Sequence, residues 1–168
     1  NAVAAREVGE QAGQHAVVAY GLAVHALADA CQGHEDEARD AAETALEVGQ
    51  ATQFTPVTQV AGAALGLLEL SLGRPAEAAA RLGPLVELAR AEGIREPGLT
   101  RYVPDQVEAL VEVGRLEEAA ELLDWFEADA ERLRRRGAIA SSRRCRGLLA
   151  AAKGRLDGSD GPGLDAPP

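Results

Sequence analysis

The sequence has few aromatic residues, and this scarcity limits the kind of hydrophobic core that it can form. Aromatic residues make up 3% of the 168 residues, whereas hydrophobic residues as a whole make up 46%. The core must therefore consist mainly of Ala, Leu and Val. Ala has the highest helix propensity, and helices lined with Ala can approach one another closely. The composition therefore predicts a core of closely packed helices.

Basic residues and cysteines are also in short supply. The chain has 17 basic and 27 acidic residues, which gives a formal net charge of −10. A surface that holds nucleic acid needs a surplus of Lys and Arg, so we expect no direct contact with nucleic acid. Cys31 and Cys145 lie far apart without metal-ligand spacing. We expect two reduced, packed thiols in a cytoplasmic protein, with a disulfide as the alternative.

Long hydrophobic runs are missing as well. The most apolar run, residues 57–72, contains Gln59 and Glu69 and is shorter than the ~20 apolar residues that span a bilayer. No secretory leader is recognisable, so we expect a soluble chain without membrane contact. The helical pattern begins at Val3 without a cap, which favours a fragment of a longer protein. Whether Asn1 and Ala2 are the remnant of a tag stays open.

Motifs that carry catalysis, cofactors or metal ions do not stand out either. His15, His25 and His34 are ten and nine residues apart, a spacing that does not align metal ligands on one helix face. The sequence has no G-x-S-x-G and no G-x-x-x-x-G-K-[ST] motif. Acidic pairs such as Glu117-Glu118 fall at predicted helix starts, where they stabilise the helix dipole. We therefore expect no catalytic, cofactor-binding or metal-binding residues.

What the sequence does contain is an internal repeat. Four similar turn segments are centred on Gly33, Gly73, Gly114 and Gly154, and they follow one another at nearly equal intervals. A regular period of about 40 residues is typical of stacked helical repeats. Each glycine is expected to end one helix in a left-handed conformation and to precede a second helix.

The apolar spacing predicts helices between these turns and a tail after them. The predicted helices cover residues 3–10, 15–31, 35–50, 57–72, 75–91, 101–113, 116–136 and 138–153, with breaks at Gly13 and Gly137. The stripe Val18, Leu22, Ala26 and Ala30 should be buried. Gly62 and Gly66 should let a neighbouring helix approach closely. We expect a repeat domain over residues 1–156 and a flexible Gly/Pro/Asp-rich tail over residues 157–168.

The turn segments resemble those of the tetratricopeptide repeat. The clearest copy is residues 110–119, Leu-Val-Glu-Val-Gly-Arg-Leu-Glu-Glu-Ala. The small residue that follows each turn is matched by Ala38, Ala78 and Ala119. The small residue that precedes it is matched by Ala26, Gly66 and Gly147, although Val107 departs from the pattern. This resemblance implies an all-α, right-handed solenoid of antiparallel helix pairs, whose repeats are longer than those of the usual form.

Longer repeats of this type resemble those of the large ATP-dependent LuxR-type transcriptional regulators, which include the maltose-regulon activator. Residues 110–123 and 143–154 are especially similar to the last repeats before the DNA-binding domain of such proteins. The resemblance implies a non-catalytic sensor or protein-interaction region that lies between an ATPase and a helix-turn-helix domain, both absent from this chain. The alternative is a free-standing scaffold that binds peptides or partner proteins.

Two sets of residues are candidates for binding a protein partner or a small effector. The first helices of solenoid repeats line the concave surface. On the family's geometry this surface includes Tyr20, Leu27, Leu67, Arg101, Glu108, Glu112 and Arg144. The alternative is that these residues only pack between repeats.

The second set is an arginine cluster in an acidic chain. Arg135, Arg136, Arg143 and Arg146 are candidates for an anion-binding or partner-binding patch. The alternative is a solvated turn in which the arginines pair with Glu127, Asp129 and Glu131. The last predicted helix, residues 138–153, has no partner helix in the sequence, which favours a homodimer through its exposed face.

Overall fold

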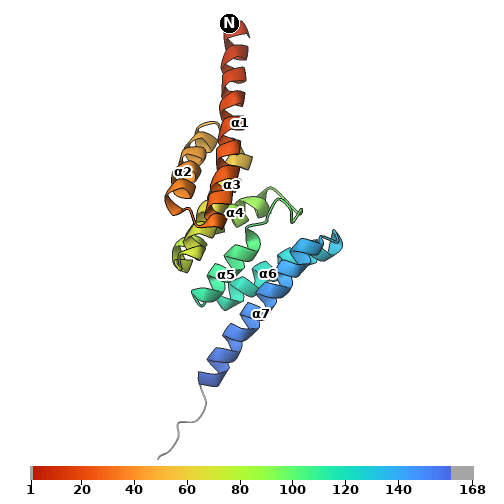
Figure 1. Ribbon diagram of the computed structural model, residues 1–168. Coiled ribbons are helices and arrows are strands. Elements are labelled where there is room, and N and C mark those ends of the chain that lie inside the picture. The colour runs from red at the N-terminus through yellow and green to blue at the C-terminus, as the bar shows by residue number, and fades with distance from the viewer. Residues whose placement is uncertain (1, 160–168) are drawn as a thin grey trace, which may run out of the picture. The chain divides into compact units, whose positions relative to one another are not determined.

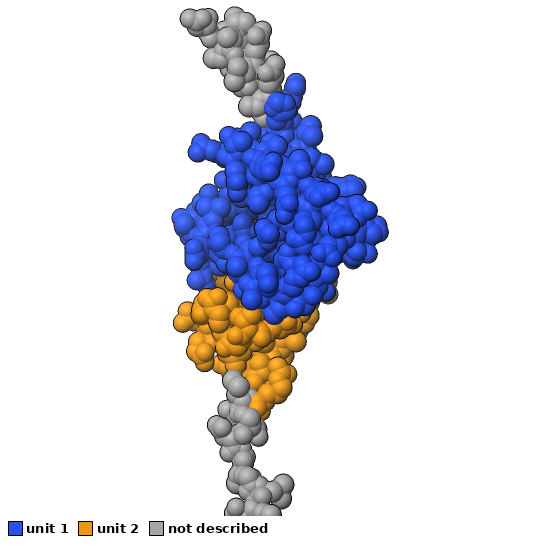
Figure 2. Space-filling view, turned by 90° about the vertical axis from the view of Figure 1, so that its left-hand side faces the viewer, with its two compact units in different colours: residues 1–94 blue, residues 95–168 orange. Residues whose placement is uncertain are grey.

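The computed structural model describes the backbone of residues 2–159 and the side chains of residues 14–155. Every regular element in this part of the chain is a helix, which confirms the predicted all-α class (Figure 1). The helices are α1 (Ala2–Gln32), α2 (Glu35–Ala51), α3 (Thr55–Ser71), α4 (Pro75–Ala91), α5 (Val103–Glu112), α6 (Leu116–Arg132) and α7 (Arg136–Ser159). Two compact units, residues 1–94 and 95–168, divide the chain (Figure 2). Among the described residues, no helix is long and apolar enough to cross a membrane.

Glycines end three helices as the repeat predicts. Gly33, Gly73 and Gly114 have φ angles of +80°, +69° and +79°, a region that glycine enters without a steric penalty. The predicted fourth turn at Gly154 is wrong, because α7 continues through this residue to Ser159. Between Gly154 and Ser159 only Leu156 is apolar, so this stretch supplies no second helix to pack back.

A second turn position in each repeat also has a left-handed backbone, but glycine marks only one of its three copies. Gln53, Gly93 and Arg134 have φ angles of +53°, +67° and +54°, and they follow one another at the same interval as the first series of turns. The predicted helix over residues 116–136 is therefore wrong at its end. Helix α6 ends at Arg132, the chain reverses at Arg134, and Gly137 lies inside α7. The side chain at position 134 gave no sign of this turn.

The two ends of the helical region differ from the prediction. The predicted break at Gly13 is wrong, because α1 is continuous from Ala2 to Gln32. A glycine in a helix interior costs only about 0.5–1 kcal/mol relative to Ala, so it does not by itself end a helix. Helix α7 runs into the first residues of the predicted tail, and residues 160–168 lie outside the described residues.

In the first unit, small side chains allow close helix packing. Helix α1 contacts α2 and α3, α2 contacts α3, and α3 contacts α4. The centre of this core consists of Ala19, Ala23, Ala45, Val57 and Ala61. The predicted role of the glycines in α3 is confirmed, because a Cβ atom added at Gly66 would lie 2.2 Å from Leu82 Cδ2 and one at Gly62 would lie 3.0 Å from Leu85 Cδ1. A side chain at position 66 would force Leu82 to move, and one at position 62 would displace Leu85 slightly.

In the second unit, α5, α6 and α7 all contact one another around larger side chains. The buried residues here include Val103, Val107, Leu110, Leu123, Phe126, Cys145 and Leu149. Each unit thus has the same order of packing, in which both helices of a pair contact the first helix of the next pair. The cysteines are free, but the prediction of two packed thiols is wrong for Cys31, which is exposed. Burial raises the pKa of the Cys145 thiol to about 11.

Candidate interaction groove in the second unit

A groove with a volume of about 730 Å³ lies between the loop that leads into α5 and the start of α7. The loop contributes Glu96, Pro97, Gly98, Leu99 and Arg101, and α5 contributes Pro104. The opposite wall consists of Phe126 from α6 and of Arg135, Arg136, Gly137, Ala138 and Ser141 around the first turns of α7. The groove therefore combines charged, apolar and small side chains.

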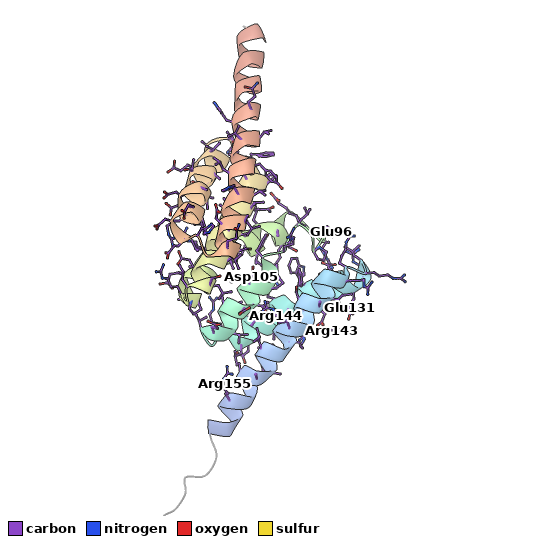
Figure 3. The ribbon with its side chains drawn as sticks, viewed as in Figure 1. Glu96, Asp105, Glu131, Arg143, Arg144 and Arg155 are labelled. Carbon is purple, nitrogen blue, oxygen red and sulfur yellow. The ribbon has the colours of Figure 1, made fainter. Side chains whose placement is uncertain are left out.

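Glu96 ties the loop to the start of α7 (Figure 3). Arg135 donates hydrogen bonds from Nε and Nη2 to the two carboxylate oxygens of Glu96, each at 2.9 Å. The Gly98 N–H donates to the same carboxylate at 3.1 Å. These hydrogen bonds lower the pKa of Glu96 below its ordinary value, and the contribution from Arg135 is the largest. Bidentate pairs between arginine and a carboxylate fix geometry, so this pair holds the groove in shape.

A second arginine holds the beginning of the same loop. Arg95 Nε donates to Asp129 Oδ2 at 2.5 Å, and Arg132 Nη2 donates to Asp129 Oδ1 at 2.9 Å. Asp129 is only 2% exposed, so its carboxylate needs both partners. The hydrogen bond from Arg95 contributes most to lowering the pKa of Asp129. Two adjacent loop residues, Arg95 and Glu96, are thus held by ion pairs to α6 and to the start of α7.

Two other arginines of the groove carry charge that no described side chain neutralises. Arg101 and Arg136 are exposed, line the groove and have no ion-pair partner among the described side chains. Leu99, in the same groove, is 62% exposed. Helix α7 begins at Arg136, directly after Arg134 and Arg135, whereas α2, α4, α5 and α6 have acidic residues in their first turns. Positive charge is unfavourable at a helix N-terminus, and a bound anion would relieve it.

The predicted arginine patch is divided among different partners. Arg135 pairs with Glu96, and Arg146 pairs with Asp124 at 2.8 Å and with Glu127. Arg136 and Arg143 have no ion-pair partner among the described side chains. Of these two, Arg136 lines the groove and Arg143 does not. The predicted pairing with Glu127 is therefore found for Arg146, whereas Arg135 pairs with Glu96, which was not among the predicted partners.

The predicted concave-face residues fall into three groups. Arg101 lies in the groove. Glu108 forms an ion pair with Arg144 that joins α5 to α7, and Glu108 and Glu112 line a second cavity of about 340 Å³ with Val111, Leu148, Ala151 and Arg155. In the first unit, Tyr20 is exposed, whereas Leu27 and Leu67 are half-buried against alanine clusters. The structure therefore brings Arg101 together with Arg136, a pair that the sequence analysis had placed in different sets.

Asp105 was missed by the sequence analysis. It lies in the first turn of α5, close to Glu108 and Arg144. Burial raises the pKa of Asp105 to about 6, although the positive charge of Arg144 opposes the shift. A carboxylate in the first turn of a helix is normally stabilised by the helix dipole, so the sequence position of Asp105 gave no sign of a raised pKa.

Among the described residues, no group of three or more His, Cys, Asp or Glu side chains is arranged to hold a metal ion. The Nδ1 atom of His25 lies 2.7 Å from Asp29 Oδ2, and that of His34 lies 3.3 Å from Asp29 Oδ1. No family model, no curated protein and no solved structure matches the chain.

Proposed function

We propose that this chain is a non-catalytic, tetratricopeptide-like repeat region that binds an acidic segment of a partner protein in the groove of its second unit. The observation that carries this proposal is that Arg101 and Arg136, which lack an ion-pair partner among the described side chains, share one groove with the exposed Leu99. The chain as a whole is acidic, so unneutralised positive charge in a cavity needs an explanation. An acidic segment with one apolar side chain would complement both features.

Two observations support the solenoid part of the proposal. The left-handed residues recur in two series, one ending the first helix of each pair and one ending the second, and both series have the same period. Within each unit, the helices also contact one another in the order that stacked helix pairs require. A solenoid of antiparallel helix pairs would account for both.

The resemblance of the turn segments supports a further proposal about the setting of this region. We place it in a LuxR-type transcriptional regulator, next to an ATPase and a helix-turn-helix domain. A free-standing scaffold that binds peptides is the second candidate, because the groove needs no flanking domain for its shape. The full reading frame distinguishes the two, since only the first requires a P-loop and a helix-turn-helix sequence beside this region.

Binding in the groove can be tested with a fluorescein-labelled peptide of alternating Glu and Leu, measured by fluorescence anisotropy at low ionic strength. The matched control peptide has Gln in place of Glu. We expect the acidic peptide to bind more tightly, and the combined change Arg101→Gln and Arg136→Gln to weaken its binding at least tenfold. Arg143→Gln, which removes an exposed arginine outside the groove, should leave binding unchanged. Equal binding by all three proteins would contradict the proposal.

A small anionic effector would behave differently in the same titration. If the ligand is a protein segment, succinate should displace the peptide no better than sodium chloride does at the same ionic strength. If succinate displaced the peptide at concentrations at which sodium chloride has no effect, the ligand class would be a small dicarboxylate and not a protein segment.

A further inference from the structure

Helix α1 presents an apolar face that its own unit leaves uncovered. Val17 is 72% exposed, Val18 64%, Val24 47% and Tyr20 42%. The predicted burial of Val18 is therefore wrong, and the buried stripe of α1 consists of Ala16, Ala19, Ala23, Ala26 and Ala30 instead. Figure 1 shows that the N-terminal part of α1 projects past α2 and α3. The exposed face lies along one side of this helix.

Helix α3 corresponds to α1 in the next repeat, and its corresponding face is covered by α2. The positions that correspond to Val17 and Val18 in the next repeat are Val57 and Thr58 on α3. There, α2 covers the corresponding face through its buried residues Ala42, Ala45 and Gly49. A Cβ atom added at Gly49 would lie 3.0 Å from Val57 Cγ1 and 2.9 Å from Thr58 Oγ1. The two helices approach closely because position 49 is glycine.

The first residues of the chain repeat the sequence of this covering helix. Residues 2–9 and 42–49 are identical at five of eight positions, which are Ala2/Ala42, Ala5/Ala45, Glu7/Glu47, Val8/Val48 and Gly9/Gly49. Gly13 corresponds to Gln53, the left-handed residue that lets α2 lead into α3. Residues 2–9 therefore have the sequence of a covering helix. Because α1 does not turn at Gly13, however, they continue along its axis and do not cover its exposed face.

We propose that a second copy of this chain covers the face, with its residues 2–12 lying antiparallel on Val17, Val18 and Val24. In an antiparallel pair of α1 helices that cross near Gly13, Gly9 of one copy faces Val17 of the other, and Ala5 faces Gly21. This register reproduces the contact between Gly49 and Val57 within the unit. The contact is symmetric, so each copy covers the face of the other.

Disulfide trapping tests this arrangement in the full chain with Cys31→Ser, while the buried Cys145 is kept. Two single variants, Gly9→Cys and Val17→Cys, are oxidised alone and mixed. We expect a linked dimer only in the mixture, because the register brings position 9 close to position 17 of the other copy but keeps like positions about 12 Å apart along the helix. No linkage in the mixture, or equal linkage in each variant alone, would overturn the proposal.

A double variant with Gly9→Cys and Val17→Cys separates the dimer from a chain that folds back on itself at Gly13. Linkage between copies supports the proposal, whereas an internal disulfide in a monomer overturns it. Sedimentation gives an independent readout without cysteines. The unmodified chain should be a dimer at tens of micromolar and Val17→Glu should be a monomer of equal helicity. Leu72→Glu, a change at another exposed apolar residue, should remain a dimer. A monomeric unmodified chain would contradict the proposal.

Discussion

The two units have the same order of helix packing but very different charge. Residues 1–94 contain five basic and 13 acidic residues, whereas residues 95–168 contain 12 and 14. In the first unit, Arg39 and Arg74 are both used to neutralise the buried Glu69. In the second unit, the arginines exceed what its buried carboxylates need, and two of them line a groove without an ion-pair partner among the described side chains. The comparison indicates that the repeat supplies the scaffold, while the surplus of arginine supplies the capacity to bind.

The cores of the two units differ as well. The first unit packs alanine and glycine against leucine, so its helices depend on the absence of side-chain atoms at a few positions. The second unit fills its centre with Val, Leu and Phe side chains. Added side-chain volume should therefore destabilise the first unit more than the second. The four predictions below test this difference and those in buried charge and in the turns. Trp125, the only tryptophan, lies in α6 and reports unfolding of the second unit, while circular dichroism follows the whole chain.

The largest effect is expected for Gly66→Val. The new side chain would collide with Leu82, whose Cγ lies 2.4 Å from the position of an added Cβ. Overpacking of this kind should lower the free energy of unfolding by about 3 kcal/mol. The matched control is Gly147→Val in α7, where an added Cβ meets no atom within 4 Å. The control should change stability by less than about 0.5 kcal/mol, and equal losses in denaturant titrations would refute the packing argument.

The next effect concerns the buried carboxylate of the first unit. Glu69 is 4% exposed and accepts hydrogen bonds from Arg39 at 2.7 Å and from Arg74 at 3.2 Å. Burial alone would raise the pKa of Glu69, but these hydrogen bonds lower it below its ordinary value. Its contribution is therefore present above the unfolded-state pKa and is lost as the pH falls through the lower folded-state pKa.

Replacing Glu69 with Gln should cost about 2 kcal/mol at pH 7, because a charged partner loses its counter-ion. Glu118→Gln, which removes the exposed ion pair of Glu118 with Arg115, should cause no measurable loss. Thermal and denaturant unfolding of both variants checks this contrast. A loss of the same size for both would show that burial does not decide the strength of these pairs.

Asp105 should have the opposite pH dependence to Glu69. Burial raises its folded-state pKa to about 6 from an ordinary value of 3.8, so the folded unit holds the proton more tightly than the unfolded chain. Its stabilising contribution is present below about pH 3.8 and is lost as the pH rises through 6. Asp105→Asn should therefore stabilise the second unit by about 1–2 kcal/mol at pH 7 and have no effect near pH 3.5. Trp125 fluorescence during denaturation measures this difference, and a gain that did not vary with pH would exclude titration as its cause.

The smallest effects are expected at the turns. Gly114→Ala places a side chain at a φ angle of +79° and should cost about 1 kcal/mol. Arg134→Gly should gain about 0.5 kcal/mol, because Arg134 already occupies the left-handed region with a side chain. Denaturant midpoints of the two variants should shift in opposite directions. Shifts in the same direction would show that the two turn positions are not equivalent.

The sequence predicted features that have a local cause. Gly33, Gly73 and Gly114 marked their turns because glycine is the residue that a left-handed backbone favours, and the spacing of Gly62 and Gly66 indicated a close helix contact. Gln53 and Arg134 occupy the same backbone region without a matching side chain, since packing of the neighbouring helices imposes that conformation. The unmatched turn at Arg134 also moved the start of α7, so the prediction could not place Arg136 beside Arg101.

Only part of the groove could be predicted from the sequence. Arg101 was a candidate from the repeat geometry and Arg136 from the arginine cluster, but the pairing of Arg135 with Glu96 joins residues far apart in the sequence and has no local signal. The raised pKa of Asp105 likewise results from burial by other helices.

Binding in the groove can be mapped directly by titrating the ¹⁵N-labelled chain with the peptide of alternating Glu and Leu and following the amide chemical shifts. We expect the largest changes at residues 96–101 and 135–141, and we expect them to disappear when Arg101 and Arg136 are both changed to Gln. Shift changes concentrated in the first unit, or unaffected by the double change, would contradict binding in the groove.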